Sequence, residues 1–367
     1  MRILVAPESF YPSMKAQAVA QAMMRGLLLV SSHFEVSTYP LASGGIGTTD
    51  LAVRIAHGRI YHETISVPNR RPRDVKWGLL PDGTAIFNAS DVLGPPDGPS
   101  VLPDCYLNSA PLGEMLHCLL RRKPSRIVVA AGDVLTADIG MGVLESFGVT
   151  MRGALGESLR PGTRSLLGVS SMDGSSFSPP AVPLLALTDC LFPWSQRIQQ
   201  EDFRLDLIHG GLAAAASRFV DLLSEQIQLP LGDVAGTGAG GGLGVALRFL
   251  GAQFMSGADY LGALGDLRDK IWQSDWVFTG SSELSSLSHQ RAVGKVAGLA
   301  RDAGVPAVAL TLTLGRGHSE LYDAGLVGVY PVLDRPRNER DSHRALAALM
   351  EKAAYRVGYW MQALSDA

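Results

Sequence analysis

The 367-residue sequence contains few cysteines and no long apolar run. Its three cysteines, Cys105, Cys118 and Cys190, are too few and too scattered for a disulfide framework or a thiolate zinc site. Because an odd number of isolated cysteines is typical of a reducing compartment, we expect a cytoplasmic protein. No stretch reaches the roughly 18 apolar residues of a membrane-spanning helix, and the first residues have no apolar segment of signal-peptide length. We therefore expect no membrane partner.

Charged residues are also scarce. They make up 18% of the chain, against a usual share of about 25%, and the formal net charge is -3. The sequence therefore has no global basic field that would gather phosphate backbones, which argues against a dedicated nucleic-acid binder. Hydrophobic residues make up 46% of the chain, enough for a sizeable core and too many for a mainly disordered protein. The length predicts two domains of roughly 150 residues or more.

Several catalytic motifs are absent from the sequence. No pair of histidines has the spacing of two zinc ligands on one helix face, and no Gly-x-Ser-x-Gly elbow is present. No glycine-rich loop ends in Gly-Lys-Ser or Gly-Lys-Thr, so a P-loop is also excluded. These absences leave zinc hydrolase, serine hydrolase and P-loop nucleotidase functions without support.

The chain does contain repeated strand, loop and helix units. Residues 2–6 form an apolar run of strand length, and helical spacing of apolar residues begins at Met14. A second strand is predicted at 35–41, followed by the glycine loop 43–48 and a helix to residue 56. In the middle, Pro81-Asp82-Gly83 predicts a hairpin turn between two antiparallel strands. The pattern predicts an α/β fold with a doubly wound parallel sheet and a second, mixed sheet.

The two ends of the chain share a pattern of predicted secondary structure that differs from the pattern in the middle. Strand-then-helix units lie near both ends, whereas antiparallel hairpin signals lie only in between. We therefore expect one discontinuous α/β domain made of residues 1–67 and 292–367, with residues 68–291 inserted as a second α/β domain.

Two glycine-rich loops are candidate anion-binding sites. Residues 236–241 match the dinucleotide fingerprint, but Pro230 and Gly232 stand where that motif needs a strand, so a Rossmann oxidoreductase has little support. Glycine is 41 of the 367 residues, which raises the number of chance matches. The backbone amides of both loops could still bind an anion at a helix start, and tight packing or an ordinary helix start is the alternative.

Carboxylates follow two predicted buried strands. Asp133 and Asp138 come after the strand at 126–131, and Asp189 comes directly after the strand at 184–188. Ligands of open α/β sheets collect at the carboxyl ends of the strands. A carboxylate there could orient a substrate hydroxyl or hold magnesium, whereas the alternative is a helix cap or turn former. Lys295 at a helix start could contact phosphate or simply be solvated.

Taken in order, several stretches resemble bacterial glycerate kinases over nearly the whole chain. The stretches are residues 6–10, 42–48, 132–142, 187–189, 235–244, 279–280 and 294–295. The resemblance implies a flavodoxin-like domain made of both chain ends and an inserted domain similar to the restriction-endonuclease fold. It also implies phosphorylation of D-glycerate, or a related small hydroxy acid, from ATP with Mg²⁺. Whether the protein forms a homo-oligomer or binds a partner protein is left open by the sequence.

The same resemblance implies roles for individual residues. Asp189 or Asp138 would activate the hydroxyl group, Glu8 would help to hold magnesium, and Lys295 would neutralise phosphate. The residues expected to bind substrate or nucleotide are Glu8, Ser9, Gly44, Gly45, Gly132, Thr136, Gly140, Gly240, Gly241, Thr279, Gly280 and Lys295.

The sequence also departs from the family pattern, mostly from charged or polar residues towards small or apolar ones. The positions are Tyr11 for Lys, Ser43 for Asp, Ile46 for Glu, Asn88 for Glu, Val134 for Ser, and Leu191 and Phe192 for Asp and Asn. Phosphoryl transfer depends on positioning and electrostatic stabilisation, so these losses favour an alternative hypothesis. In this alternative the chain is a catalytically degenerate family member, acting as a binding, regulatory or assembly subunit, whose former site has become apolar core.

Overall fold

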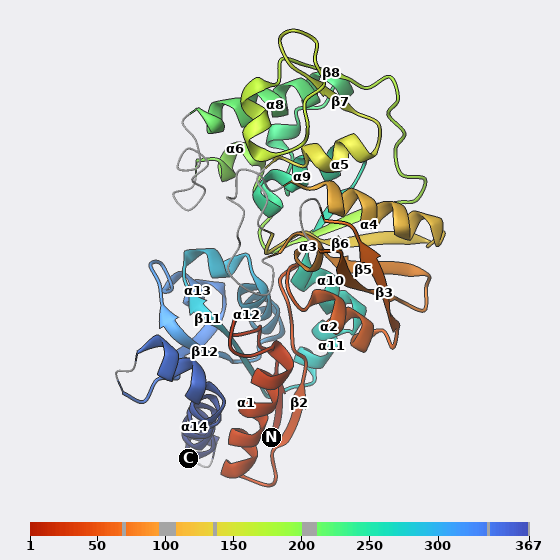
Figure 1. The fold of residues 1–367 in the computed structure, drawn as a ribbon. Coiled ribbons are helices and arrows are strands. Elements are labelled where there is room, and N and C mark those ends of the chain that lie inside the picture. The colour runs from red at the N-terminus through yellow and green to blue at the C-terminus, as the bar shows by residue number, and fades with distance from the viewer. Residues whose placement is uncertain (68–70, 95–107, 135–137, 200–210, 336–337, 366–367) are drawn as a thin grey trace. The chain divides into compact units, whose positions relative to one another are not determined.

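A computed structural model describes residues 1–67, 71–94, 108–134, 138–199, 211–335 and 338–365 (Figure 1). The chain divides into two compact units. Unit 1 consists of Met1–Ser43 and Ala258–Ala367, and unit 2 consists of Gly44–Gly257. The chain therefore leaves unit 1 after Ser43 and returns to it at Ala258.

Unit 1 contains a five-stranded sheet whose order is β13-β12-β11-β1-β2 and whose neighbouring strands are all parallel. Counted along unit 1, this is the order 2-1-3-4-5 of the flavodoxin-like fold. The order reverses between β1 and β11, and this switch point is where such sheets bind ligands. The strands are β1 (Arg2–Val5), β2 (Glu35–Thr38), β11 (Trp276–Leu284), β12 (Ala307–Leu314) and β13 (Leu326–Pro331).

The first and last long helices of unit 1, α1 and α14, pack against each other and lie side by side in Figure 1. Gly26 permits the close approach, because a Cβ atom at this position would lie 3.0 Å from the Cβ of Ala354. Together with Phe278 and Leu310 of the sheet they form one apolar core. The helices are α1 (Ala16–Val30), α10 (Gly257–Leu264), α11 (Leu267–Trp272), η5 (Ser286–His289), α12 (Ala292–Ala303), α13 (Glu320–Ala324) and α14 (Glu339–Ser365).

Unit 2 contains a six-stranded mixed sheet of order β10-β9-β6-β5-β4-β3 and a small antiparallel pair, β7 and β8. β5, β6, β9 and β10 are parallel, so their carboxyl ends meet at one edge, whereas β3 and β4 are antiparallel. The strands are β3 (Arg59–Ile65), β4 (Arg73–Leu79), β5 (Thr84–Asn88), β6 (Arg126–Ala130), β7 (Thr150–Arg152), β8 (Ser171–Asp173), β9 (Leu184–Thr188) and β10 (Gln253–Ser256).

The central strands β5 and β9 of unit 2 are buried along their whole length because helices and loops cover them. Every residue of β5 and β9 is buried, and one apolar cluster joins β5, β6 and β9 to α4, α5, α8 and α9. The helices are α2 (Thr48–Ile55), α3 (Ala89–Leu93), α4 (Ala110–Arg121), α5 (Met141–Ser146), η2 (Thr163–Gly168), α6 (Trp194–Arg197), α8 (Leu212–Ile227), η3 (Leu231–Asp233), η4 (Ala239–Gly242) and α9 (Leu243–Phe249).

The bounds of the units differ from the expected domains at both ends of the insertion. Residues 44–67, with α2 and β3, belong to unit 2, and residues 258–291, with α10, α11, β11 and η5, belong to unit 1. β3, expected with the N-terminal residues 1–67, pairs with β4, with Arg59 opposite Leu79. β11, expected in the inserted region 68–291, pairs with β1, with Ile3 opposite Trp276. Both differences follow from strand pairing, because a strand belongs to the sheet that satisfies its backbone hydrogen bonds.

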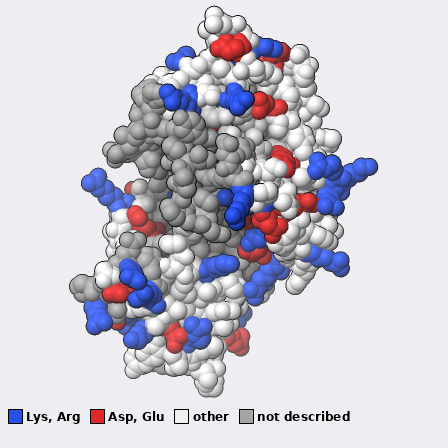
Figure 2. All heavy atoms as spheres, in the orientation of Figure 1, with Lys and Arg blue, Asp and Glu red and all other residues white. Residues whose placement is uncertain are grey.

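The surface carries charges of both signs. On the face that Figure 2 shows, Lys and Arg side chains are interspersed with Asp and Glu. Of the helices in the described part of the chain, none combines the length and the apolar character that crossing a membrane would require.

Candidate functional site

The loop before α2 lies against the carboxyl ends of β6 and β9 in unit 2. The Gly132 N–H donates to the Gly44 carbonyl oxygen at 2.9 Å. Gly44 has a φ of 110°, and a Cβ atom here would lie 2.7 Å from the Thr188 nitrogen. Only glycine fits this conformation and this space. Gly44, Gly45 and Gly132, predicted from the sequence, are thus brought together.

Two carboxylates accompany this loop. Asp133 is exposed, its Oδ2 accepts a hydrogen bond from the Ile46 N–H at 2.9 Å, and a Cβ atom on Gly45 would collide with its carboxylate. Asp189 directly follows Thr188, is half-buried, and accepts a hydrogen bond from the Cys190 N–H at 2.9 Å. Asp133 therefore contacts the Gly45 end of this loop, and Asp189 follows Thr188, whose backbone Gly44 approaches.

The second glycine loop lies against the same segment after β6. A Cβ atom on Gly240 would lie 2.6 Å from the Ala131 oxygen. Gly240, Gly241 and Gly242 have φ values of 58°, 68° and 93°, so three consecutive residues adopt left-handed conformations that favour glycine. The element before the loop is the short η3 helix, Leu231–Asp233, and not a strand. The Rossmann interpretation is therefore wrong.

Asp138 occupies a different environment from Asp189. Its side chain is fully buried and accepts hydrogen bonds from the Ser109 N–H and Oγ, at 2.8 and 2.9 Å, and from the N–H groups of Gly140 and Gly142, at 3.0 and 3.2 Å. Burial raises the pKa of Asp138, and these hydrogen bonds oppose the shift. The carboxylate orders the starts of α4 and α5, which leaves Asp189 as the accessible member of the expected catalytic pair. Thr136 lies outside the described residues.

Gly140 is also explained by packing. Its φ is 75°, and a Cβ atom on it would collide with the Cβ of Ala246 on α9. The glycine therefore lets the start of α5 approach α9 closely. Gly140 was expected to contact substrate or nucleotide, but its positive φ and its close packing against Ala246 explain why this residue is a glycine without a ligand.

In unit 1, Glu8 lies at the switch point of the five-stranded sheet. The Glu8 N–H donates to the Gly280 oxygen at 2.9 Å, and the Thr279 hydroxyl donates to the Ala6 oxygen at 2.8 Å. Thr279 and Gly280 thus support the segment after β1 through its backbone. The buried Glu8 carboxylate accepts a hydrogen bond from the Ser43 hydroxyl. Ser9 follows Glu8 and is half-buried.

Lys295 lines a cavity of about 250 Å³ in unit 1. Its Nζ forms an ion pair with Asp259 Oδ2 at 2.9 Å, and both side chains are partly exposed. The lining residues are Leu41, Ala258, Asp259, Gly262, Ala263, Asp266, Leu267, Arg268, Asp269, Lys295 and Leu299, and Glu8 is not among them.

Of the apolar residues at the positions that depart from the family pattern, Val134 packs against the core of unit 2, whereas the other four do not form a core. Tyr11 is 57% exposed and Leu191 is 38% exposed. Ile46 and Phe192 are half-buried. The expectation that these four side chains fill a former site as core is therefore wrong.

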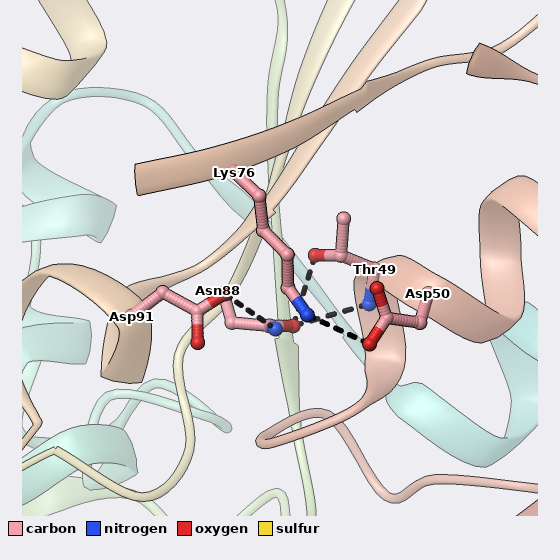
Figure 3. Close-up of polar contacts among 5 residues, drawn as sticks. All are labelled: Thr49, Asp50, Lys76, Asn88 and Asp91. Atoms are coloured by element: carbon pink, nitrogen blue, oxygen red, sulfur yellow. Dashed lines mark hydrogen bonds and ion pairs between the residues drawn. The ribbon is translucent and has the colours of Figure 1, made fainter. Parts of the chain in front are cut away.

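A polar network lies beside the Gly44–Ile46 loop, and the sequence did not predict it (Figure 3). Asn88 at the end of β5 accepts hydrogen bonds from the Thr49 N–H and hydroxyl, at 3.1 and 2.9 Å, and donates to Asp91 at 3.1 Å. Lys76 on β4 forms an ion pair with Asp50 at 2.7 Å. Burial raises the pKa of Asp91, and the nearby Lys76 ammonium partly offsets this. Of the residues in this network, the sequence analysis singled out only Asn88, as a departure from the family pattern.

Oxygen donors suited to Mg²⁺ are present in both units, although they do not make a complete protein site. Within the described residues, no group of three His, Cys, Asp or Glu side chains is arranged to hold a metal ion. Mg²⁺ commonly binds through one or two carboxylates together with substrate phosphates and water. Asp133 and Asp189 in unit 2, or Glu8 in unit 1, fit that mode.

Comparison with known proteins shows similarity along nearly the whole chain. The model of the glycerate kinase family matches residues 3–193 and 209–362. Glycerate 2-kinase of Escherichia coli (strain K12) is 26% identical over 351 residues, which cover 91% of each chain. Glycerate kinase of Bacillus subtilis (strain 168) is 25% identical over 374 residues, which cover 96% of each chain.

The fold of the chain is similar to that of a solved structure. It is a crystal structure from Salmonella typhimurium LT2, described as a candidate glycerate kinase 2. It aligns with a TM-score of 0.78 and 24% identity, and the alignment covers 100% of both chains. This similarity confirms the predicted fold of two α/β domains.

Proposed function

Because this chain belongs to the glycerate kinase family, we propose that it transfers the γ-phosphoryl group of ATP to a hydroxyl group of D-glycerate or a related small hydroxy acid. The observation that carries the proposal is the match to the glycerate kinase family model, which covers residues 3–193 and 209–362 and so extends over both units. The placement of Asp133 and Asp189 beside the Gly44–Gly45 peptide supports it, because carboxylates at this edge suit a hydroxylated substrate.

In the proposed reaction Asp189 accepts the proton of the substrate hydroxyl. The hydroxyl oxygen bonds to the γ-phosphorus, the bond from that phosphorus to the β,γ-bridging oxygen breaks, and ADP leaves. Asp189 is suited to this role because it is half-buried, whereas Asp138 is fully enclosed by its donors. A positioned general base contributes roughly 10² to 10⁴ in rate.

The remaining residues are proposed to bind the reactants. The backbone at Gly240 and Gly241 and the Gly44–Gly45 loop offers amides to phosphate oxygens, and Lys295 reaches phosphate by exchanging its partner Asp259. Glu8 and Asp133 are the proposed magnesium ligands of units 1 and 2. Mg²⁺, when bound, neutralises charge on the phosphates. Each unit thus offers its own groups for binding the nucleotide or the acid.

The catalytically degenerate alternative gains no support from these observations. The two relatives compared above carry kinase names, and Tyr11 and Leu191 are exposed and do not seal a site. We therefore retain the kinase proposal alone.

A coupled assay of ADP release with D-glycerate, ATP and Mg²⁺ tests the proposal. We expect turnover on the order of 1 to 100 per second, usual for kinases, and a loss of roughly 10² to 10⁴ in Asp189→Asn. Asp302→Asn, at a partly exposed aspartate of α12, is the matched control and should keep full activity. Absence of glycerate-dependent ADP release by the wild type would refute the function, and full activity of Asp189→Asn would refute the assigned base.

A further inference from the structure

We propose that Asn88 and Lys76 are positioning residues that hold the start of α2, and through it the Gly44–Ile46 loop, against Asp133. The inference rests on the proposed function, since it concerns the same edge of the unit 2 sheet, where the carboxyl ends of the parallel strands meet. Neither residue needs to touch substrate. Figure 3 shows their side chains converging on the first turn of α2 from β4 and β5.

The first tether runs through Asn88. This side chain is 1% exposed, and its Oδ1 accepts from both the backbone N–H and the hydroxyl of Thr49. Its Nδ2 donates to Asp91 on α3, which fixes the orientation of the amide. Two donors at adjacent points of the same residue leave little freedom for Thr49, which is itself fully buried.

The second tether runs through Lys76. Its ammonium group pairs with Asp50, the residue after Thr49, at 2.7 Å. The side chains are 30% and 41% exposed, so solvent screens the pair only partly. Lys76 and Asn88 therefore hold two successive residues of α2 from two neighbouring strands, β4 and β5.

At its α2 end the loop is closed by one further backbone hydrogen bond, from the Thr48 N–H to the Gly45 oxygen at 3.2 Å. Gly47 precedes α2 with a φ of 89°, and a Cβ atom there would meet nothing within 4 Å. Beyond Gly47, the Ile46 N–H donates to Asp133 Oδ2. The position of Ile46, and with it the Asp133 carboxylate, therefore depends on where Thr49 and Asp50 are held.

Charge explains why position 88 carries an amide and not a carboxylate. Asp50 and Asp91 both lie near the ammonium of Lys76, and the charge of Asp50 adds to the upward shift in the pKa of Asp91, which Lys76 and Arg73 oppose. A carboxylate at position 88 would lack the N–H donors that now bind Asp91 and would add a third negative charge. Asn88 is the residue type that can accept from Thr49 and donate to Asp91 at once.

The test uses pairs of variants that keep or remove the hydrogen bond of the Thr49 hydroxyl to Asn88, or the ion pair between Lys76 and Asp50. Thr49→Val removes the hydroxyl donor with little change of volume, and Thr49→Ser keeps it. Lys76→Met removes the ammonium group, and Lys76→Arg keeps a positive charge. Asn88→Ala is avoided because it strips a fully buried site of several bonds at once. Each variant is measured for kcat and KM with D-glycerate and ATP, and for hydrogen exchange of residues 44–50, with α8 as the internal reference.

We expect Thr49→Val and Lys76→Met to speed exchange at residues 44–50 by tenfold or more and to lower kcat/KM about tenfold, with α8 unchanged. Thr49→Ser and Lys76→Arg should remain within about twofold of the wild type. Unchanged exchange in the loop, or faster exchange with unchanged kcat/KM, would overturn the inference. If the wild type has no glycerate-dependent turnover, the proposed function fails on its own, and the exchange of residues 44–50 still decides whether the tethers hold the loop.

Discussion

The Ser43 hydroxyl donates a hydrogen bond to the Glu8 carboxylate and accepts one from the Ala292 N–H at 3.2 Å. This hydroxyl joins the segment after β1 to the start of α12. An N–H at the start of a helix has no partner within the helix, so an acceptor at that point is stabilising. Ser43 is also the last residue of unit 1 before the chain enters unit 2.

Replacing Ser43 by alanine should lower the free energy of unfolding by about 1 to 3 kcal/mol, because a buried carboxylate loses a donor and a helix N–H loses its acceptor. Urea denaturation measures the change. Ser319→Ala is the control, since Ser319 is exposed and makes no side-chain cap, and it should stay within about 0.5 kcal/mol of the wild type. Equal effects of the two variants would contradict the role given to the hydroxyl.

Asp138→Ala should be more damaging to stability than any change at Asp189. It leaves the N–H groups of Ser109, Gly140 and Gly142 buried without this acceptor, and each such loss costs roughly 1 to 3 kcal/mol. We expect a loss of about 3 kcal/mol or more, measured by denaturant unfolding. The exposed Asp221→Ala serves as the comparison. A stable but inactive Asp138→Ala would instead restore Asp138 as a catalytic candidate.

The carboxyl group of Asp91 should make stability depend on pH. Burial raises the pKa of Asp91, so the folded protein binds its proton more tightly than the unfolded chain does. This contribution is fully present below the ordinary aspartate pKa of about 3.9 and is lost as pH rises through the folded-state pKa. In Asp91→Asn the amide oxygen can still accept from Asn88, but nothing titrates there.

The free energy of unfolding of the wild type, relative to Asp91→Asn, should therefore fall as the pH rises above about 4. Chemical denaturation of both proteins over a series of pH values measures this difference. A difference that grows with pH would mean that Lys76, and not burial, dominates the environment of Asp91.

Two glycines of one loop separate backbone strain from lack of space. Gly44 and Gly47 both have positive φ, but only Gly44 has backbone atoms where a Cβ would lie, the nearest at 2.7 Å. Gly47→Ala should cost about 1 to 2 kcal/mol from strain alone. Gly44→Ala should cost clearly more and lower kinase activity, because the loop must move away from Thr188. Thermal unfolding and the ADP assay measure both effects, and equal losses would show that the contact is not limiting.

Local signals predicted the fold well. The predicted Pro81-Asp82-Gly83 turn joins β4 to β5, and Gly83 has a positive φ of 82°. The runs at 126–131 and 184–188, predicted as strands, form β6 and β9, and the structure pairs them as parallel neighbours. The bounds of the units were harder to predict, because the pairing of β1 with β11 joins residues that are far apart in sequence.

The site was predicted only in part, because some of its contacts join residues that are far apart in the sequence. Gly132 and Asp189 follow β6 and β9, which are parallel neighbours, so the sheet rule brings these two residues together. Asp138 follows the same rule, yet Ser109, which belongs to a different helix start, encloses it. No pattern near Asp138 reveals that donor. Similarly, Lys76 meets Asp50 only because α2 packs against β4, which the local sequence does not show.

The return of the chain to unit 1 at Ala258 sets an order for folding during synthesis. β1 needs β11 as a neighbour, and β11 begins at Trp276, so at roughly 5 to 20 residues per second about 15 to 55 seconds separate the two strands on the ribosome. Unit 2 is complete before β11 emerges. The apolar residues of β1 and α1 therefore lack their core partners on β11 and α14 during this time, and this apolar surface stays open to aggregation.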